Sequence, residues 1–301
     1  MVTIPESEPI IQELNPEWHS SKVNRVDMLR LDTIHPVVSG NKWYKLKHNI
    51  AYAQQNGYDT ILSFGGAYSN HLVATSAAAR HYKIKSIGVI KGLYAARRPT
   101  PTLTECTDNG MLLEFVSNED YAKKNYSEFL EELSAKFDNP FIIPEGGANE
   151  LGREGSGEIA NYIPQGYTHI CISVGTGTTL IGLRNLLARD INIWGYVPMK
   201  GGTYMQSEIE KHVLPDLQKS YLLFDNWHFG GFGKFNEDLI NFMNSFYSTN
   251  NIPLDMVYTA KMMYGINAQI QSDFFPADAN ILCIHTGGLQ GNVTVKEKLN
   301  Y

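Results

Sequence analysis

Short apolar segments alternate with helix-like segments along most of the chain, and this alternation limits the possible folds more than any other feature. The helix-like segments place apolar residues three and four positions apart, as one face of a helix requires. The expected strands are residues 23–29, 58–64, 85–91, 111–116, 140–144, 167–174, 191–197 and 281–285. Because parallel strands need long crossover connections, we predict an α/β protein with open parallel sheets and helices on both faces.

The chain is long enough to divide its core between two domains. It has 301 residues, of which 43% are hydrophobic, and cores of such chains commonly split. A polar, glycine-rich segment at residues 145–152 separates the first group of strands from the second. We interpret it as the crossing between a small domain of residues 44–151 and a large cofactor-binding domain of residues 1–43 and 152–301.

Charge and cysteine content indicate the class of partner and the compartment. The formal net charge is −6 and no segment is dominated by basic residues, which argues against nucleic acid and favours a small molecule. Cys106, Cys171 and Cys283 are odd in number and far apart, so we expect buried free thiols in a reducing cytoplasm. We expect no membrane partner, since no 18-residue apolar run occurs, and no metal, since no His, Cys and carboxylate set has ligand spacing.

Lys42 lies at the start of an expected helix that runs from about Asn41 to Gly57, with Ser39 or Asn41 as its N-cap. Cations are disfavoured at this end of a helix, so the pKa of Lys42 should fall and its neutral amine could attack a carbonyl. A phosphate held by Lys45 would relieve the remaining repulsion. Both features suit pyridoxal 5'-phosphate, a phosphate-bearing aldehyde cofactor. A solvated basic helix start is the alternative.

A second turn offers a phosphate site. Gly175-Thr-Gly-Thr-Thr179 joins an expected strand to an expected helix, and its N–H groups and hydroxyls can cradle a phosphate at the helix start. A dinucleotide fingerprint is a rival interpretation. It fits less well because the third glycine falls on Leu180 and the strand at 191–197 ends without an acidic residue. A plain tight turn remains open.

Ser69, Asn70 and His71 present a hydroxyl, an amide and an imidazole where another helix begins. The two glycines before them allow a ligand to approach the backbone, although Ser69 or Asn70 could simply cap the helix. Three further segments would each pass in isolation for a cap, a turn or a mobile loop: Tyr258-Thr259, Thr286–Gly288 and Gly230–Lys234.

Together these segments resemble the fold-type II pyridoxal-phosphate enzymes, which share a tryptophan synthase β-like fold. Within them, the chain is similar to the group of 1-aminocyclopropane-1-carboxylate deaminases and D-cysteine desulfhydrases. The resemblance covers about residues 23–290, and its motifs occur in the family's order: Gly40–Leu46, Ser63–Asn70, Val174–Thr178, Asp255–Lys261 and His285–Gly288.

The resemblance implies a role for each site residue. Lys42 would be the Schiff-base lysine, Ser69 would receive the substrate carboxylate, and Tyr258 would stand over the reacting carbons. Asn70 would bond the cofactor's phenolic oxygen, with His71 and Phe232 on the substrate side. The phosphate grip would comprise Lys45, Gly175, Thr176, Gly177, Thr178 and Thr179.

Two positions distinguish the activities within this group. Deaminases have glutamate after the tyrosine and leucine before the final glycine pair, whereas this chain has Thr259 and Thr286, the desulfhydrase type. A hydroxyl can bond a neutral pyridine nitrogen but supplies no negative charge to keep a proton there. We therefore expect β-elimination, with D-cysteine giving pyruvate, ammonia and hydrogen sulfide.

Three alternatives stay open. The chain could be a 1-aminocyclopropane-1-carboxylate deaminase, a serine or threonine dehydratase-like lyase, or a pyridoxal-phosphate-binding protein without turnover. Lys42 and Tyr258 are both candidates for the base that takes the substrate proton. The resemblance also implies a homodimer.

Overall fold

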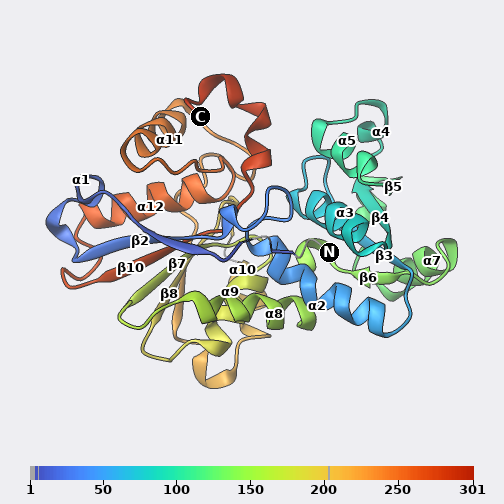
Figure 1. Ribbon diagram of the computed structural model, residues 1–301, viewed down its shortest axis with the longest axis horizontal. Helices are drawn as coiled ribbons and strands as arrows, with labels where there is room; N and C mark the ends of the chain where they lie inside the picture. Colours follow the sequence, from blue (N-terminus) through green and yellow to red (C-terminus); the bar gives the residue numbers. More distant parts are fainter. Residues whose placement is uncertain (1–3, 6, 203) are drawn as a thin grey trace.

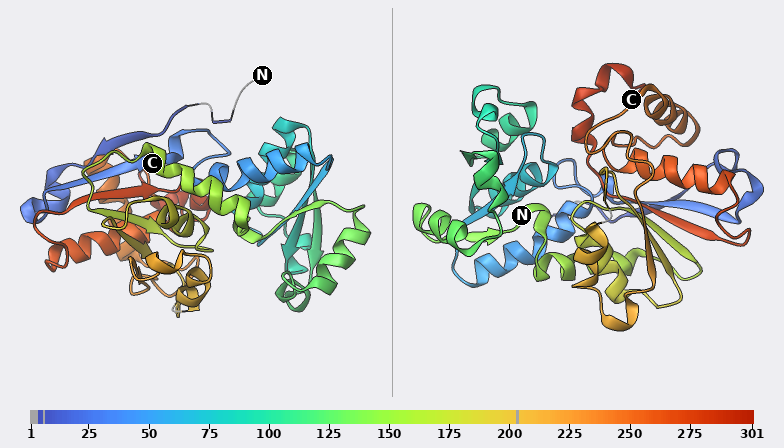
Figure 2. Two further views of the ribbon diagram at one scale, coloured as in Figure 1. Left: turned by 90° about the horizontal axis from the view of Figure 1, so that it is seen from below. Right: turned by 180° about the vertical axis from the view of Figure 1, so that it is seen from behind.

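The computed structural model describes residues 4, 5, 7–202 and 204–301, and it contains a larger and a smaller β-sheet, each in its own lobe (Figures 1 and 2). The larger sheet has the order β1-β2-β10-β7-β8-β9. Its strands are β1 (Ile10–Glu13), β2 (Arg25–Arg30), β7 (His169–Ser173), β8 (Asn192–Tyr196), β9 (Tyr221–Phe224) and β10 (Asn280–His285). All neighbouring pairs are parallel except β1 and β2. The predicted parallel α/β fold is thus confirmed.

The smaller sheet is parallel throughout, with the order β5-β4-β3-β6. Its strands are β3 (Thr60–Gly65), β4 (Lys85–Lys91), β5 (Met111–Val116) and β6 (Phe141–Ile143). Every residue of β3 is buried, as expected for a strand covered on both faces. All four strands fall within the proposed small domain, whose boundaries at residues 44 and 151 remain a prediction.

Helices cover both faces of each sheet. They are α1 (Pro16–His19), α2 (Asn41–Gln55), α3 (Asn70–Tyr82), α4 (Tyr94–Arg97), α5 (Pro101–Asp108), α6 (Asn118–Ala122), α7 (Ser127–Lys136), α8 (Glu150–Gly157), α9 (Thr178–Leu186), α10 (Tyr204–Glu210), α11 (Glu237–Asn250) and α12 (Thr259–Gln271). In the larger lobe, α11 and α12 lie on one side of the sheet, and α8 and α9 lie on the other (Figure 1).

The strands of the larger sheet contribute alternate side chains to two cores. Ile170 and Ile172 belong to the core that includes residues of α2 and α9, whereas Cys171 and Cys283 belong to the core under α11 and α12. This alternation follows from the two-residue period of a strand. All three cysteines are buried and free, as predicted.

Several elements differ from expectation. The apolar spacing of residues 119–137 predicts one helix, but the structure has two, α6 and α7. The chain turns at Lys123, whose carbonyl accepts a hydrogen bond from the Tyr126 N–H. The sequence reasoning missed α10 and β9; β9 is an edge strand with only its first residue buried, so its apolar signal is weak. Within the described residues, no helix has both the length and the apolar character needed to cross a membrane.

Candidate active site

Two of the predicted site segments follow the carboxyl ends of adjacent strands in the larger sheet. Strands β7 and β10 pair with each other, and from them the sheet continues through β8 on one side and β2 on the other. Open α/β sheets bind ligands at such a switch point. The turn Gly175–Thr179 follows β7, and Thr286–Gly288 follows β10.

Gly40 fixes the helix that carries Lys42 against the turn after β10. It is the N-cap of α2, with φ +65° and ψ −153°. Among the residues that the structure describes, no side chain caps this helix, so the predicted cap by Ser39 or Asn41 is wrong. The Asn41 N–H donates to the Thr286 carbonyl at 3.3 Å. A Cβ at Gly40 would lie 2.0 Å from that carbonyl oxygen. Only glycine therefore permits this approach.

Lys42 and Lys45 are two amines whose charge the fold disfavours. Burial lowers the pKa of Lys42 to about 8, while the nearby Asp255 acts in the opposite direction. Burial and the neighbouring Lys42 lower the pKa of Lys45 to about 7. Lys42 Nζ donates to Asn41 Oδ1 at 2.6 Å, and Asn41 Nδ2 donates to Thr179 Oγ1 at 2.9 Å. Asn41, which the sequence reasoning treated only as a cap, thus connects Lys42 to the turn after β7.

The turn after β7 leaves its helix start open to an anion. Gly177, with φ +81°, is the N-cap of α9, and no side chain in the described part of the chain caps that helix. The hydroxyls of Thr176 and Thr178 lie 2.8 Å apart. A short 3-10 segment, η3 (Glu145–Gly147), passes between this turn and Lys45 and packs closely against both. A Cβ added at Gly146 would lie 2.7 Å from Thr176 Cγ2, and a Cβ added at Gly147 would lie 3.0 Å from Lys45 Cβ. Free N–H groups, hydroxyls and a cation therefore converge.

Ser69, Asn70 and His71 lie at the start of α3, as expected. Ser69 Oγ accepts from the Leu72 N–H at 3.3 Å and so caps the helix. Asn70 Nδ2 donates to the Gly288 carbonyl at 3.3 Å, which joins this start to the turn after β10. Its Oδ1 is buried without a partner in the described part of the chain, and a buried polar atom of this kind requires a ligand or water.

His71 is a buried, neutral imidazole with a fixed tautomer. The Ser63 hydroxyl donates to the Ile143 carbonyl at 2.8 Å, so at 2.9 Å it must accept from His71 Nε2–H. His71 Nδ1 is then a buried acceptor to which no described residue donates a hydrogen bond. Burial, with Lys45 and Lys42 nearby, lowers the pKa of His71 to about 3. We therefore expect the imidazole to stay neutral and its Nδ1 to accept a hydrogen bond from a ligand.

The aromatic ring of Tyr258 lies close to the Lys42 amine. Lys42 Nζ lies 6.0 Å from the centre of its ring, and Phe232 meets the same ring edge-on at 5.8 Å. Burial, with Asp255 and Glu145, raises the pKa of Tyr258 above its ordinary value. The hydroxyl therefore stays protonated at neutral pH. Lys42, Tyr258 and Phe232 are thus brought together as expected.

The two threonines singled out in the sequence differ in their surroundings. Thr259 is fully buried, and its hydroxyl bonds the Asp255 carboxylate at 2.7 Å. Asp255 accepts three further bonds, from the backbone N–H groups of residues 257, 258 and 259. Thr286 has no side-chain hydrogen bond within the described residues. The hydroxyl of Thr286 is therefore free for a ligand and that of Thr259 is not, a difference the sequence reasoning missed. The sequence did contain a signal for the bond between Thr259 and Asp255, because an aspartate four residues before a threonine at a helix start can hydrogen-bond it.

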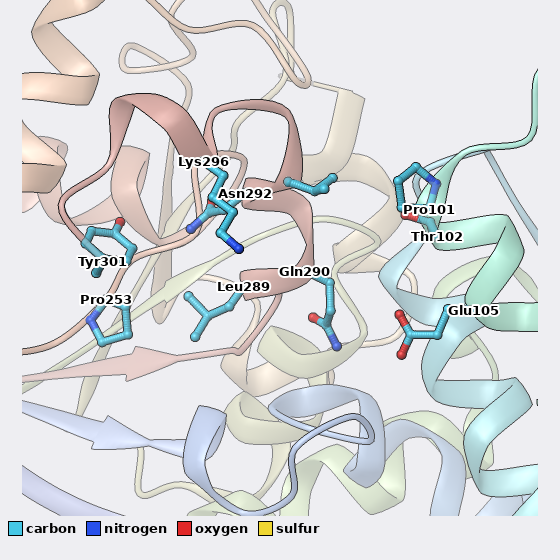
Figure 3. Close-up of a pocket in the computed structure, with 10 residues that line it drawn as sticks. Pro101, Thr102, Glu105, Pro253, Leu289, Gln290, Asn292, Lys296 and Tyr301 are labelled. Carbon is cyan, nitrogen blue, oxygen red and sulfur yellow. The ribbon is translucent and has the colours of Figure 1, made fainter.

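These residues fit pyridoxal phosphate. Lys42 and its lowered pKa suit an aldehyde, the open start of α9 with Lys45 suits a phosphate, and Asn70 offers an unsatisfied buried oxygen. A cavity of about 440 Å³ lies outside this group, between α5 and the 3-10 segment η6 (Leu289–Thr294) that follows the turn after β10 (Figure 3). Within the described residues, no three or more His, Cys, Asp or Glu side chains are placed to hold a metal ion.

Comparisons with known proteins agree with this chemistry. The model of the family described as pyridoxal-phosphate dependent enzymes matches residues 20–287. A Pyrococcus horikoshii protein named "Putative 1-aminocyclopropane-1-carboxylate deaminase" is 28% identical over 286 residues, which cover 87% of this chain and 84% of that protein. A crystal structure of an "ACC deaminase homologue" is 27% identical, with TM-score 0.83 over 98% of this chain and 94% of that one.

A more distant structure shows the fold alone. Threonine deaminase isoform 2 from Solanum lycopersicum is 17% identical, with TM-score 0.67 over 95% of this chain and 82% of that one. The extent of the family match, together with the lysine, the phosphate cradle and the switch-point position, leads to one conclusion: this chain belongs to the pyridoxal-phosphate dependent enzymes, with pyridoxal 5'-phosphate as its cofactor.

Proposed function

We propose that this enzyme releases ammonia from a small amino acid by breaking a bond at the substrate's β-carbon, which leaves a 2-oxo acid. The observation that carries the proposal is the pairing of Lys42, whose pKa is about 8, with a Tyr258 that stays protonated beside it. When bound, the cofactor supplies an electron sink for negative charge at the reacting carbon. Side chains and backbone groups of the protein carry out the proton transfers and bind the cofactor and the substrate.

The protonation states divide the proton transfers between the two side chains. The neutral amine of Lys42 is a base with a pKa close to the working pH, where general-base catalysis is most effective. Tyr258 cannot act as a base while its pKa is raised, so it serves as a donor. The sequence left both as candidate bases, and we propose that Lys42 takes the proton while the Tyr258 hydroxyl, which keeps its own proton, donates a hydrogen bond to the leaving group.

Binding roles follow from the same contacts. We propose that Lys42 would hold the cofactor's aldehyde carbon, and that Lys45 with residues 175–179 would hold its phosphate. Ser69 and the backbone at the start of α3 would bind the substrate carboxylate, since a helix start favours an anion. The hydroxyl of Thr286 would meet the pyridine nitrogen, because that of Thr259 is already bonded to Asp255.

Two substrates compete for this reaction. The names of the relatives favour 1-aminocyclopropane-1-carboxylate, which would give 2-oxobutanoate and ammonia, over the D-cysteine that the sequence analysis placed first. Thr259 and Thr286 favour D-cysteine, because neither residue supplies a carboxylate to the ring nitrogen and hydrosulfide leaves readily.

The test is to incubate the cofactor-loaded protein with the cyclopropane amino acid, D-cysteine and L-cysteine separately. Release of 2-oxobutanoate identifies the deaminase, and pyruvate with sulfide from D-cysteine identifies the desulfhydrase. Lys42→Ala should abolish turnover. The matched control is Lys47→Ala, which removes an amine of the same helix that bonds Glu158 and lies over the Tyr44 ring, and it should retain turnover. If none of the amino acids is consumed, the proposed function fails and a binding role without turnover takes its place.

The cellular setting is part of the proposal. We expect a cytoplasmic homodimer, and the dimer rests on the family resemblance. Light scattering of the purified protein tests it, because a monomeric mass for the cofactor-loaded enzyme would contradict it.

A further inference from the structure

The glycine-rich segment at residues 227–234 follows one side of α12 back to the active site. The Trp227 ring packs over Gly265, where a Cβ would lie 2.7 Å from the indole. Phe229 meets Tyr264 edge-on at 4.9 Å, and Phe232 then meets Tyr258 at the start of the helix. We call residues 227–234 the glycine loop.

The glycine loop lacks the bonds of regular structure and carries unusual backbone angles. The φ values of Phe229, Gly230, Gly231 and Gly233 are +52°, +94°, +122° and +68°. Two consecutive turns form it, in which the Gly231 N–H donates to the His228 carbonyl and the Lys234 N–H donates to the Gly231 carbonyl, each at 3.0 Å. At its tip the Phe232 side chain is 59% exposed. A segment of this kind needs an external contact to hold one conformation.

Lys261 supplies that contact. Its side chain reaches from α12 to the two carbonyls that begin those turns, with Nζ donating to the His228 oxygen at 2.9 Å and to the Gly231 oxygen at 2.8 Å. Lys261 is only 2% exposed and has no salt bridge within the described residues. A buried ammonium without a paired carboxylate is costly, so these two bonds compensate for a real penalty.

We propose that Lys261 is a positioning residue that fastens the glycine loop to α12 and thereby fixes Phe232 against Tyr258, so that the Phe232 ring forms the apolar wall facing the substrate side chain. The substrate part of this inference rests on the proposed function. A phenylalanine ring offers no hydrogen bond, so this wall favours methylene, methyl and thiol groups over hydroxyl or charged ones. Sequence reasoning had placed Phe232 on the substrate side without a reason for its position.

The first test measures how well the glycine loop is held in place, and it needs no substrate. Hydrogen–deuterium exchange of the Gly231 and Lys234 amides should become roughly tenfold faster in Lys261→Met and return in Lys261→Arg, which keeps a cation able to donate to both carbonyls. The matched control is Arg184→Met, because Arg184 is another buried cation that donates only to backbone carbonyls, those of residues 187, 188, 191 and 220. Exchange of the two loop amides, measured relative to β10, should not change in that control.

The second test asks whether Lys261 acts through Phe232. With whichever amino acid the enzyme consumes, Lys261→Met and Phe232→Ala should each raise KM roughly tenfold with little change in kcat. The double variant should also lie near tenfold, because removal of the ring leaves nothing for the lysine to position. Additive effects, near a hundredfold, would overturn the proposal.

Unchanged exchange of the loop amides in Lys261→Met would also overturn it. If that variant does not fold, Lys261→Gln replaces it: its amide can hold one of the two carbonyls, so intermediate exchange is expected and unchanged exchange contradicts the proposal. Failure of the proposed reaction is separate. A protein that consumes no amino acid but shows faster loop exchange in Lys261→Met retains the fastening role of the lysine and loses only the substrate wall.

Discussion

Replacement of Gly40 by alanine should loosen the joint between the lysine helix and the turn after β10. Two costs add at this position. The backbone angles of Gly40 lie in a region that only glycine adopts readily, which costs about 1–3 kcal/mol for alanine. The new Cβ would also lie 2.0 Å from the Thr286 carbonyl oxygen, so backbone on one side must move. We expect a total loss of about 3 kcal/mol or more in the free energy of unfolding.

Gly57 offers a matched control just beyond the other end of the same helix. It also has a positive φ, +76°, but a Cβ there would meet nothing within 4 Å. Gly57→Ala should therefore cost only the conformational strain, about 1–2 kcal/mol. Denaturant unfolding of both variants measures the difference. Cofactor affinity should fall only in Gly40→Ala, because the start of the helix that carries Lys42 meets the Thr286 backbone at that joint. Equal losses of stability in the two variants would refute the close approach on which the site is built.

Three further predictions concern buried polar groups. Thr259→Val should lower the free energy of unfolding by about 1–3 kcal/mol, because the buried Asp255 carboxylate loses a hydrogen-bond donor. Thr286→Val should leave the free energy of unfolding unchanged and alter the absorbance of the bound cofactor. The reverse pattern would contradict the assignment of the free hydroxyl to Thr286. Folding lowers the pKa of Lys45 from 10.5 to about 7, so between these pH values the chain takes up a proton when it unfolds. The free energy of unfolding of the cofactor-free protein should therefore rise with pH across that window. Denaturant unfolding at pH 7 and at pH 10.5 should show a smaller rise in Lys45→Met. Arg184→Met should cost about 3 kcal/mol or more, while Arg80→Met, which loses one surface bond, should cost under about 0.5 kcal/mol in the same assay.

The sequence predicted those features that depend on neighbours along the chain. Strands β4 and β5 and helix α3 have the expected bounds because continuous apolar runs and a serine N-cap are local signals. The turns after β7 and β10 could likewise be predicted, since glycines and hydroxyls followed apolar strands.

Contacts between distant segments could not be predicted in this way. Gly40 caps α2 because the Thr286 carbonyl occupies the space of a side chain, and nothing near Gly40 in the sequence indicates this. The same holds for the bonds from Lys261 to the glycine loop. The hydrogen bond between Thr259 and Asp255 joins residues four positions apart, so the sequence contained a signal for it. The resemblance to the family instead led us to predict that the Thr259 hydroxyl bonds the pyridine nitrogen of the cofactor.

The most direct test of the account is to identify the lysine that holds the cofactor. The structure lowers the pKa of three lysines, Lys42, Lys45 and Lys261, so each is a chemically plausible amine. Borohydride reduction of the cofactor-loaded protein, followed by proteolysis and mass spectrometry, fixes the cofactor to the amine that carries it. We predict the adduct on Lys42 alone, and its absence from Lys42→Ala. An adduct on Lys45 or Lys261 of the unaltered protein, or none on any lysine, would contradict it.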